Sequence, residues 1–328
     1  MKIDIVGAGA LGLLFGGKLA EAGERVRFWT RTAAQAELLR REGVELTEPD
    51  GTIHIIEGKR FAADALEQTT ETDMAEAPDW LLLTTKQGHI TETLLTVCGR
   101  LAGKHTRIVC FQNGAGHLER IRQIIPGQAL YAAITTEGAK RADGRSVTRA
   151  GFGETRAGIY KPEDGESGGT GVDSPEFSGE SLVKLLRKAG FNAFLSNDIG
   201  REMFRKLLIN AVINPLTAIW RIPNGQLLES EARIAAMRQL CDEGERIFRA
   251  NGIAYDADIY AQILEVCRST AGNTSSMLKD VLAGNPTEID FINGRLAEMA
   301  RAKQVDAPGH ELVWLLIRGM QPDMHIKI

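Results

Sequence analysis

Short apolar runs alternate with stretches of helical spacing throughout the N-terminal part of the chain. The apolar runs have the length of buried strands and cover residues 3–6, 25–30, 80–84 and 107–111. The helical stretches follow them at residues 10–22, 32–41, 89–101 and 117–125. Because strands that alternate with helices are typical of a parallel sheet with crossover helices, this pattern predicts a doubly wound α/β fold of the Rossmann type.

The pattern changes in the second part of the chain. A helix over residues 181–189 and a strand over residues 191–195 are expected to complete the sheet, and the Gly-, Ser-, Pro- and acid-rich residues 161–179 predict an exposed loop. Beyond this point long helical patterns occur with almost no strand pattern. We therefore predict two domains, a Rossmann-type domain over residues 1–196 and a mainly α-helical domain over residues 197–328.

Composition excludes several classes of protein. The net charge is −4 and no long basic run occurs, so we expect no nucleic-acid partner. No apolar run approaches the length of about 18 residues that a membrane span needs, and the N-terminus has no signal peptide, so we expect a cytoplasmic protein. The 4 cysteines and 6 histidines are scattered without metal-ligand spacing. Without a metal site, acid–base chemistry should depend on Lys, Glu or Asp.

A glycine-rich motif stands between the first predicted strand and the first predicted helix. It fits the pattern G-x-G-x-x-G and consists of Gly7, Ala8, Gly9, Ala10, Leu11 and Gly12. Gly7 permits the tight turn, Gly9 lets a pyrophosphate approach the backbone, and Gly12 lets helix and strand pack closely. The N–H groups at the start of the helix would then face the phosphates. The alternative is a structural turn that binds no ligand.

The residues that follow the second predicted strand bear on which dinucleotide is bound. NAD-binding chains usually place Asp or Glu about 20 residues after the glycines, where it bonds the ribose 2′-hydroxyl. This chain has Thr30, Arg31 and Thr32 there. A guanidinium without a neighbouring acid suits the 2′-phosphate, so we predict NADPH as the cofactor. Alternatively, Arg31 is only a solvated loop residue.

Two further predicted strands end in polar residues. Lys86 follows the run at residues 80–84, and Asn113 follows the run at residues 107–111. Since open α/β sheets bind ligands at the carboxyl ends of their strands, Lys86 could pair with a cofactor phosphate and Asn113 could bond the nicotinamide or the substrate. Each could equally be a polar cap on a buried strand.

The helical part contains a polar stripe in an apolar segment. Lys206, Asn210 and Asn214 follow one another at i,i+4 spacing and therefore share one helix face. Buried polar groups need partners, which a bound ligand would supply, unless the stripe lies on the surface. Further on, Asn285, Pro286 and Glu288 look like a helix start, with Asn285 as N-cap. In that interpretation Glu288 could simply be the acid of a capping box.

At the level of its motifs the chain resembles the ketopantoate reductases (2-dehydropantoate 2-reductases). The matching blocks are GAGALG at 7–12, TTK at 84–86, QNGAG at 112–116, RKLLINAVINPLTAI at 205–219 and SSMLKDVLAGNPTEIDFINGRL at 275–296. The resemblance implies NADPH-dependent reduction of 2-dehydropantoate to (R)-pantoate, a step towards pantothenate and coenzyme A. The protein would then act on a small 2-oxo acid, as a monomer or a homodimer.

The resemblance also implies roles for individual residues. Lys206 matches the catalytic lysine, and Glu288 matches the acid that orders the substrate. The matches to substrate-contacting residues are Asn113, Asn210, Asn214, Asn224 and Ser276, although a plain turn explains Asn224 equally well. Arg31 and Lys86 match positions that hold the NADPH phosphates, and Asn113 and Glu288 are also expected beside the cofactor.

Two features depart from the family pattern. Gln112 stands where the family often has His, and the loop at residues 161–179 is longer than usual. These departures leave open a reductase of another branched 2-oxo acid with the same fold. A non-catalytic NADP(H) sensor is a further alternative, but it gives no reason for the stripe of Lys206, Asn210 and Asn214 or for Glu288.

Overall fold

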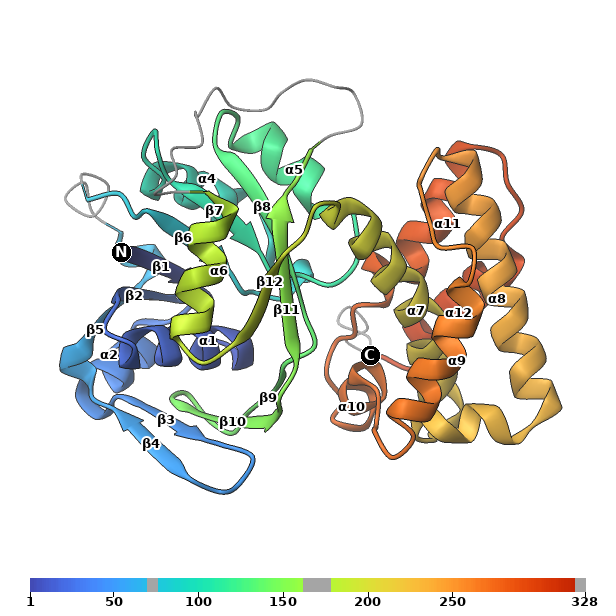
Figure 1. Ribbon diagram of the computed structural model, residues 1–328, viewed down its shortest axis with the longest axis horizontal. Coiled ribbons are helices and arrows are strands. Elements are labelled where there is room, and N and C mark those ends of the chain that lie inside the picture. Colours follow the sequence, from blue (N-terminus) through green and yellow to red (C-terminus); the bar gives the residue numbers. More distant parts are fainter. Residues whose placement is uncertain (70–75, 162–177, 322–328) are drawn as a thin grey trace, which may run out of the picture. The chain divides into compact units, whose positions relative to one another are not determined.

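The computed structural model describes residues 1–69, 76–161 and 178–321, which form two units (Figure 1). The first unit comprises Met1–Gln112 and His117–Ile199. The second comprises Asn113–Gly116 and the chain from Gly200 onwards. The short segment Asn113–Gly116 therefore belongs to the second unit, although it directly follows a strand of the first. The loop predicted at residues 161–179 lies largely outside the described residues.

An eight-stranded sheet forms the centre of the first unit, in the order β12-β11-β8-β7-β6-β1-β2-β5 (Figure 1). Its strands are β1 (Lys2–Val6), β2 (Arg25–Thr30), β5 (Phe61–Ala65), β6 (Trp80–Leu83), β7 (Arg107–Cys110), β8 (Ala129–Thr135), β11 (Glu154–Ile159) and β12 (Asn192–Leu195). All neighbours pair in parallel except β8 and β11, which are antiparallel. The Rossmann-type fold is confirmed, but the expectation of an all-parallel sheet is wrong at this one pair.

The described residues of this unit include the α-helices α1 (Ala10–Glu21), α2 (Ala33–Glu42), α4 (Glu92–Leu101), α5 (His117–Ile124) and α6 (Gly179–Lys188). Short 3₁₀ helices occupy Gly58–Arg60 (η1), Leu66–Gln68 (η2) and Gln87–His89 (η3). α4 begins later than predicted because Thr91 caps it, its hydroxyl accepting a hydrogen bond from the N–H of Leu94 at 3.2 Å. Thr32 caps α2 in the same way, through the N–H of Gln35.

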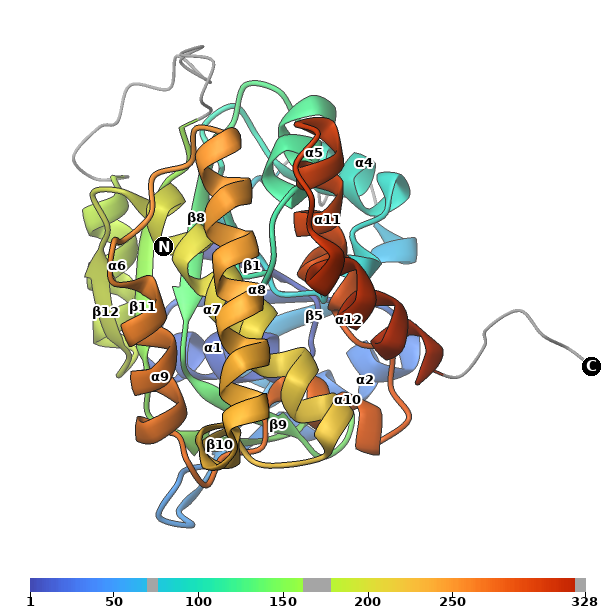
Figure 2. The same cartoon turned by 90° about the vertical axis from the view of Figure 1, so that its right-hand side faces the viewer.

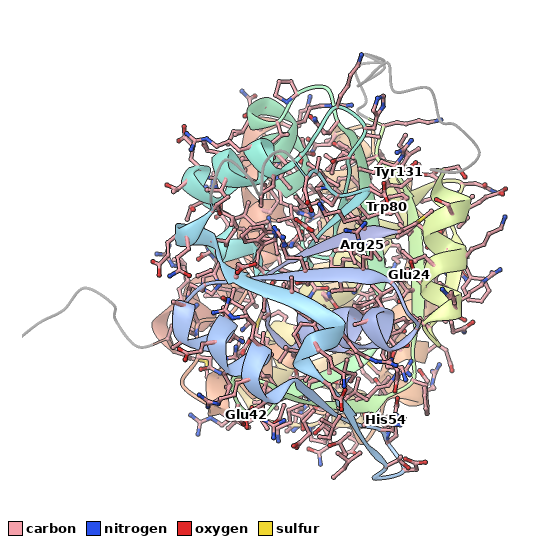
Figure 3. All side chains as sticks on the ribbon, turned by 90° about the vertical axis from the view of Figure 1, so that its left-hand side faces the viewer. Glu24, Arg25, Glu42, His54, Trp80 and Tyr131 are labelled. Carbon is pink, nitrogen blue, oxygen red and sulfur yellow. The ribbon has the colours of Figure 1, made fainter. Side chains whose placement is uncertain are left out.

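The core of this unit lies where helices pack on continuous apolar strands. All four residues of β6 are fully buried, as expected of a parallel strand covered on both faces. Trp80 on β6 meets Tyr131 on β8 edge to face, with ring centroids 5.3 Å apart (Figure 3). On α1 a Cβ at Gly16 would lie 2.3 Å from the ring of Phe28, so glycine allows this helix to approach β2 closely.

A second, four-stranded sheet was not predicted from the sequence. Its order is β4-β3-β10-β9, with β3 at Val44–Thr47, β4 at Ile53–Ile56, β9 at Gly138–Arg141 and β10 at Ser146–Gly151. A turn at residues 48–51 joins β3 to β4, and the N–H of Gly51 closes it by donating to the carbonyl of Glu48. A buried ion pair joins β10 to Glu137, the residue before β9, because Nε and Nη2 of Arg149 donate to its carboxylate at 2.8 and 2.7 Å.

The regular elements of the second unit's described residues are all helices, which confirms the prediction of a mainly α-helical part. Its α-helices are α7 (Ile199–Trp220), α8 (Glu231–Ala250), α9 (Ile259–Ser269), α10 (Ser276–Leu282), α11 (Asn293–Ala302) and α12 (Pro308–Gly319). Short 3₁₀ helices occupy Asn224–Glu229 (η5) and Ile289–Phe291 (η6). In Figure 2 the long helix α8 runs along the whole unit, with α9 on one side and α12 on the other.

Helix α7 is the centre of this unit's core. A Cβ on Gly244 of α8 would lie 2.2 Å from Leu208 of α7, so the glycine allows the two helices to approach closely.

None of the helices in the described parts of the chain combines the length and the hydropathy of a membrane span. The same part of the chain contains no group of three or more His, Cys, Asp or Glu side chains placed to hold a metal ion.

Candidate active site

The glycine-rich loop joins β1 to α1 and has the geometry of a dinucleotide-binding turn. Gly7 has φ +104°, a left-handed conformation that favours glycine. A Cβ on Gly12 would lie 1.9 Å from the carbonyl oxygen of Gly7, so only glycine allows the helix to start this close to the turn. A Cβ on Gly9, by contrast, would meet no atom within 4 Å. The loop is therefore open at Gly9, where the motif needs room for phosphates.

The start of α1 adds the electrostatic part of this site. The helix begins at Ala10, and Gly9 at the N-cap has no side chain to cap it. The first-turn N–H groups, which include those of Leu11 and Gly12, are thus left without a side-chain acceptor. Free N–H groups at the positive end of a helix dipole bind phosphate. Ala8, the remaining residue of the motif, lies in the turn before them.

Strand order places this loop where open sheets bind ligands. β1 lies between β2 and β6, and the strand order reverses direction at β1 and β6. The loop is bonded to both neighbours: the N–H of Gly7 donates to the carbonyl of Trp29 at 3.0 Å, and the hydroxyl of Thr84 donates to the carbonyl of Gly7 at 2.7 Å. The TTK block at the end of β6 therefore supports the loop directly.

The ends of β6 and β7 each contribute one buried polar atom that has no partner among the described residues. The amide nitrogen of Gln112 donates to the carbonyls of Leu83 and Thr85, at 2.9 and 3.0 Å. Its oxygen and the hydroxyl oxygen of Thr85 are buried and have no hydrogen-bond partner among the described residues. Buried polar atoms of this kind are normally satisfied, here by a ligand or its water. The residues at this edge of the sheet therefore fit a bound dinucleotide.

Gln35 holds the glycine-rich loop from a third side, a contact that was not predicted from the sequence. Its amide nitrogen donates to the carbonyl of Ala8 and to the carbonyl of Gly144, both at 2.8 Å. Gly144 lies in the turn between β9 and β10. The four-stranded sheet thus helps to fix the backbone of the loop, through a residue 27 positions further along the chain.

The two predicted phosphate ligands are exposed at strand ends of the same unit. Arg31 follows β2 and forms no hydrogen bond or ion pair with a described residue. Lys86 follows β6 and precedes the 3₁₀ helix at Gln87–His89. The residues on either side of Arg31 are Thr30 and Thr32, and neither has an acidic side chain. The guanidinium is therefore available to an anion at the position where a ribose 2′-substituent would be recognised.

In the helical unit the structure brings together Asn113, Glu288 and Lys206. The amide nitrogen of Asn113 donates to Oε2 of Glu288 at 3.1 Å, across 175 positions of the sequence. The same short segment is held by the N–H of Ala115, which bonds the carbonyl of Phe291 at 3.4 Å. Asn113 is therefore more than a cap on β7, because its side chain holds a carboxylate of the helical unit.

Lys206 has the electrostatic properties of a proton donor. It lies on α7 in a segment whose next residues, Leu207 and Leu208, are fully buried. Burial lowers the pKa of Lys206 to about 8, and the negative charge of Glu288 acts in the opposite direction. A lysine with this pKa is mostly protonated at neutral pH and still gives up its proton readily.

Asn210 and Asn214 continue the face of α7 on which Lys206 lies. The i,i+4 spacing holds because α7 is continuous from Ile199 to Trp220. Asn210 is half-buried and Asn214 is buried, and neither amide is hydrogen-bonded to a described side chain or backbone group. Amide groups that make no hydrogen bond within the protein can donate to a ligand that carries oxygen atoms.

The predicted helix start at Asn285 is wrong. Residues 285–288 are irregular, and the 3₁₀ helix η6 begins only at Ile289. The segment is held instead by Thr287, whose N–H and hydroxyl both bond the side chain of Gln321, at 3.3 and 3.0 Å. Since no helix begins at Asn285, Glu288 is not the acid of the predicted capping box, and its carboxylate accepts a hydrogen bond from Asn113 instead.

The last two predicted substrate residues have different surroundings. Ser276 is exposed at the start of α10, where its neighbour Ser275 is the residue that caps the helix. Asn224 is buried, and its amide nitrogen donates to the hydroxyl of Thr270 at 2.8 Å. Its oxygen is buried without a partner among the described residues. The interpretation of Asn224 as a turn residue accounts for the donor but not for this oxygen.

Comparison with known proteins agrees with this geometry. The family model for "Ketopantoate reductase PanE/ApbA" matches residues 3–162, and its C-terminal counterpart matches residues 198–321. The 2-dehydropantoate 2-reductase of Shigella flexneri is 31% identical over 97% of this chain and 94% of its own. That of Bacillus subtilis is 30% identical over 98% of both chains. The chain belongs to the ketopantoate reductase family.

Solved structures show the same fold in other members of this oxidoreductase family and beyond. A probable 2-dehydropantoate 2-reductase from Bacillus subtilis has a TM-score of 0.81 at 28% identity, and the match covers 98% of this chain and 100% of the other. The ternary structure of D-mandelate dehydrogenase with NADH and anilino(oxo)acetate has a TM-score of 0.84 at 23% identity, covering 98% of both chains. At that level of identity the second similarity shows the fold alone.

Proposed function

We propose that this member of the ketopantoate reductase family catalyses the NADPH-dependent reduction of 2-dehydropantoate to (R)-pantoate. The observation that carries the proposal is the group formed by Lys206, Glu288 and Asn113 in the helical unit. A partly desolvated lysine beside a bonded carboxylate can supply the proton donor that reduction of a carbonyl requires. A protein that only senses dinucleotides would have no use for it.

Lys206 would act on the carbonyl oxygen of the substrate. When bound, the reduced nicotinamide supplies the hydride, and negative charge develops on the oxygen at C2. The ammonium group would stabilise that charge and then transfer its proton to the oxygen. The lowered pKa of Lys206, about 8, makes this transfer easier than it would be for an exposed lysine.

The polar residues around Lys206 would hold the substrate in the reactive orientation. Glu288 would accept a hydrogen bond from the substrate hydroxyl, while Asn113 keeps its carboxylate in place. Asn210 and Asn214, one and two turns along α7, would donate to the substrate carboxylate or carbonyl. Ser276 and Asn224 would complete the set. Orientation of this kind is a large share of the catalysis of a single-step reduction.

The preference for NADPH would come from the first unit. Arg31 is exposed after β2 with no acid beside it, which suits a 2′-phosphate and offers nothing to a free 2′-hydroxyl. Lys86, after β6, would bind a second phosphate group. The open backbone at Gly9 and the start of α1 would bind the pyrophosphate.

A second candidate is the reduction of another branched 2-oxo acid by the same residues. It is compatible with the fold, because the structure of D-mandelate dehydrogenase with NADH and anilino(oxo)acetate has the same fold. The chain also differs from the family pattern at Gln112, where the family often has His. Lys206 would act on the oxo group in the same way, whereas the hydrogen bond to Glu288 would form only with an acid that carries a hydroxyl group.

The test is oxidation of NADPH followed by its near-ultraviolet absorbance, with 2-dehydropantoate and with a panel of other 2-oxo acids, each repeated with NADH. Fast turnover with 2-dehydropantoate and NADPH supports the full proposal. Turnover only with another oxo acid supports the second candidate. Binding of NADPH without turnover of any acid would overturn both and favour a dinucleotide sensor.

A further inference from the structure

Helix α7 contains a proline between the polar face and its C-terminal end. Pro215 lies directly after Asn214 and well inside the helix. Because proline has no N–H, the carbonyl four residues earlier, that of Ala211, lacks its helical donor. Ala211 is fully buried, so water cannot easily replace that donor. The missing bond falls between Asn210 and Asn214, the two amides of the proposed substrate face.

A side chain from another helix supplies the missing donor. The amide nitrogen of Asn293, the first residue of α11, donates to the carbonyl of Ala211 at 2.9 Å. Asn293 is fully buried. Asn293 lies 82 positions beyond Ala211 in the sequence, so only folding brings its amide to the carbonyl that Pro215 leaves without a donor.

His310 fixes the orientation of that amide. The Nε2 atom of His310 is 3.0 Å from the carbonyl oxygen of Leu240, so this nitrogen carries the proton. The Nδ1 atom is therefore an acceptor, and it receives the second hydrogen of the Asn293 amide nitrogen at 3.0 Å. Burial lowers the pKa of His310 to about 4, which keeps the ring neutral. A reversed Asn293 amide would point its oxygen at two acceptors.

The other side of Pro215 is anchored to a different helix. The hydroxyl of Thr217 lies 2.9 Å from the carbonyl oxygen of Asn214 and 2.8 Å from the hydroxyl of Ser275, the residue that caps α10. The missing hydrogen bond would join Ala211 to position 215. Its Ala211 end, next to Asn210, is thus bonded to α11, and its other end, next to Asn214, is bonded to α10. The bond from Asn293 gives the Ala211 carbonyl the donor that Pro215 cannot supply.

We propose that Asn293 is a positioning residue for the reduction, replacing the hydrogen bond that Pro215 removes and so fixing Asn210 and Lys206 relative to Asn214. This inference rests on the proposed function for its kinetic consequence. The hydrogen-bonding claim itself rests only on the structure. Asn293 does not touch the substrate in this proposal and acts through α7.

The test is a double-mutant cycle between Asn293 and Pro215. Asn293→Leu removes the donor while keeping a similar side-chain volume, and Pro215→Ala restores the backbone N–H that Ala211 lacks. In the natural background, Asn293→Leu should raise KM for the oxo acid about tenfold, the size expected from one lost buried hydrogen bond. The affinity for NADPH should not change. In the Pro215→Ala background the same substitution should leave KM nearly unchanged.

A matched control separates positioning from general loss of stability. Asn251, also in the helical unit, donates to the carbonyl of Ile247 at 2.8 Å but lies far from Pro215 in the sequence and bonds no residue of α7. Asn251→Leu should lower the urea midpoint of unfolding without raising KM, and Pro215→Ala should not rescue it. If Asn293→Leu behaves like Asn251→Leu, Asn293 has a structural role only and the inference is wrong.

The design remains informative if one part fails. If Asn293→Leu does not fold alone, Pro215→Ala is compared with and without it: equal KM values support the inference, and a KM about tenfold higher in the double variant overturns it. If the unmodified protein reduces no 2-oxo acid, the proposed function has failed. The coupling between the two positions is then measured from urea midpoints, where additive effects would overturn the hydrogen-bonding claim.

Discussion

The two units carry their candidate functional groups in opposite ways. In the first unit the site is made of backbone: the turn at Gly7, the open N–H groups after Gly9 and the close approach at Gly12 need only local sequence. In the helical unit the site is made of side chains from distant segments, as the bond between Asn113 and Glu288 shows. A backbone site can be read as a motif, whereas a side-chain site exists only once the chain has folded.

This contrast predicts separable effects of substitution. Changes to the glycine-rich loop should act on dinucleotide affinity, because they alter the space and the N–H groups offered to phosphates. Changes to the α7 face should act on turnover and on KM for the oxo acid. A substitution that altered both equally would indicate that the two sets of residues do not have the separate roles proposed here.

The largest expected effect is that of Lys206→Ala. Removing a positioned proton donor should lower kcat by about 10²-fold or more, and the dissociation constant for NADPH should stay the same. Lys279→Ala is the matched control, because Lys279 is an exposed lysine on α10. Steady-state kinetics and fluorescence titration with NADPH would measure the two quantities. Near-full turnover of Lys206→Ala would remove the lysine from the mechanism.

The next effect is that of Gly9→Ala. Since a Cβ on Gly9 meets no protein atom within 4 Å, the variant should fold normally, but the methyl group would occupy the space of the phosphates. We expect NADPH to bind about tenfold more weakly or worse, with the thermal midpoint unchanged. Gly272→Ala, in the helical unit and equally free of neighbours, should change neither quantity. Unchanged affinity in Gly9→Ala would mean that the pyrophosphate does not approach this loop.

The contrast between local and distant contacts also separates the features that the sequence predicted from those that it did not. The strands β1, β2, β6 and β7 and the glycine-rich loop were found because apolar runs and glycine spacing are local properties. The four-stranded sheet was missed because β3 pairs with β10, about a hundred residues away, and neither strand is a continuous apolar run. Local pattern also failed at Asn285, where a helix start was predicted.

The candidate side chains show the same limit. Lys206, Asn210 and Asn214 could be grouped from the sequence because one helix carries all three. That Glu288 lies beside Asn113 could not be derived from spacing. Asn293 was missed for the same reason. A proline inside a helix signals that some donor must replace its N–H, but the sequence does not say which residue provides it.

A smaller effect is expected for Arg31→Ala, which tests the preference for NADPH. Loss of the guanidinium removes a charged partner of the 2′-phosphate but nothing that a 2′-hydroxyl needs. We expect the ratio of kcat/KM for NADPH to that for NADH to fall about tenfold, mainly through the NADPH value. Arg120→Ala is a suitable control because Arg120 is an exposed arginine on α5 of the same unit. An unchanged ratio would assign the preference to other residues.

The smallest effect concerns pH and separates Lys206 from its carboxylate neighbour. A general acid must be protonated, so kcat/KM should be constant below the lysine pKa of about 8 and fall above it. Because the charge of Glu288 raises that pKa, Glu288→Gln should move the decline in kcat/KM to lower pH.

The stability of the fold should depend on pH in the opposite direction. Above pH 8 the unfolded chain keeps the Lys206 proton to higher pH than the folded chain, so this group makes folding more favourable as pH rises. Activity and the free energy of unfolding should therefore diverge between pH 8 and the ordinary lysine pKa. A decline in activity that Lys206→Arg left in place would show that another group titrates.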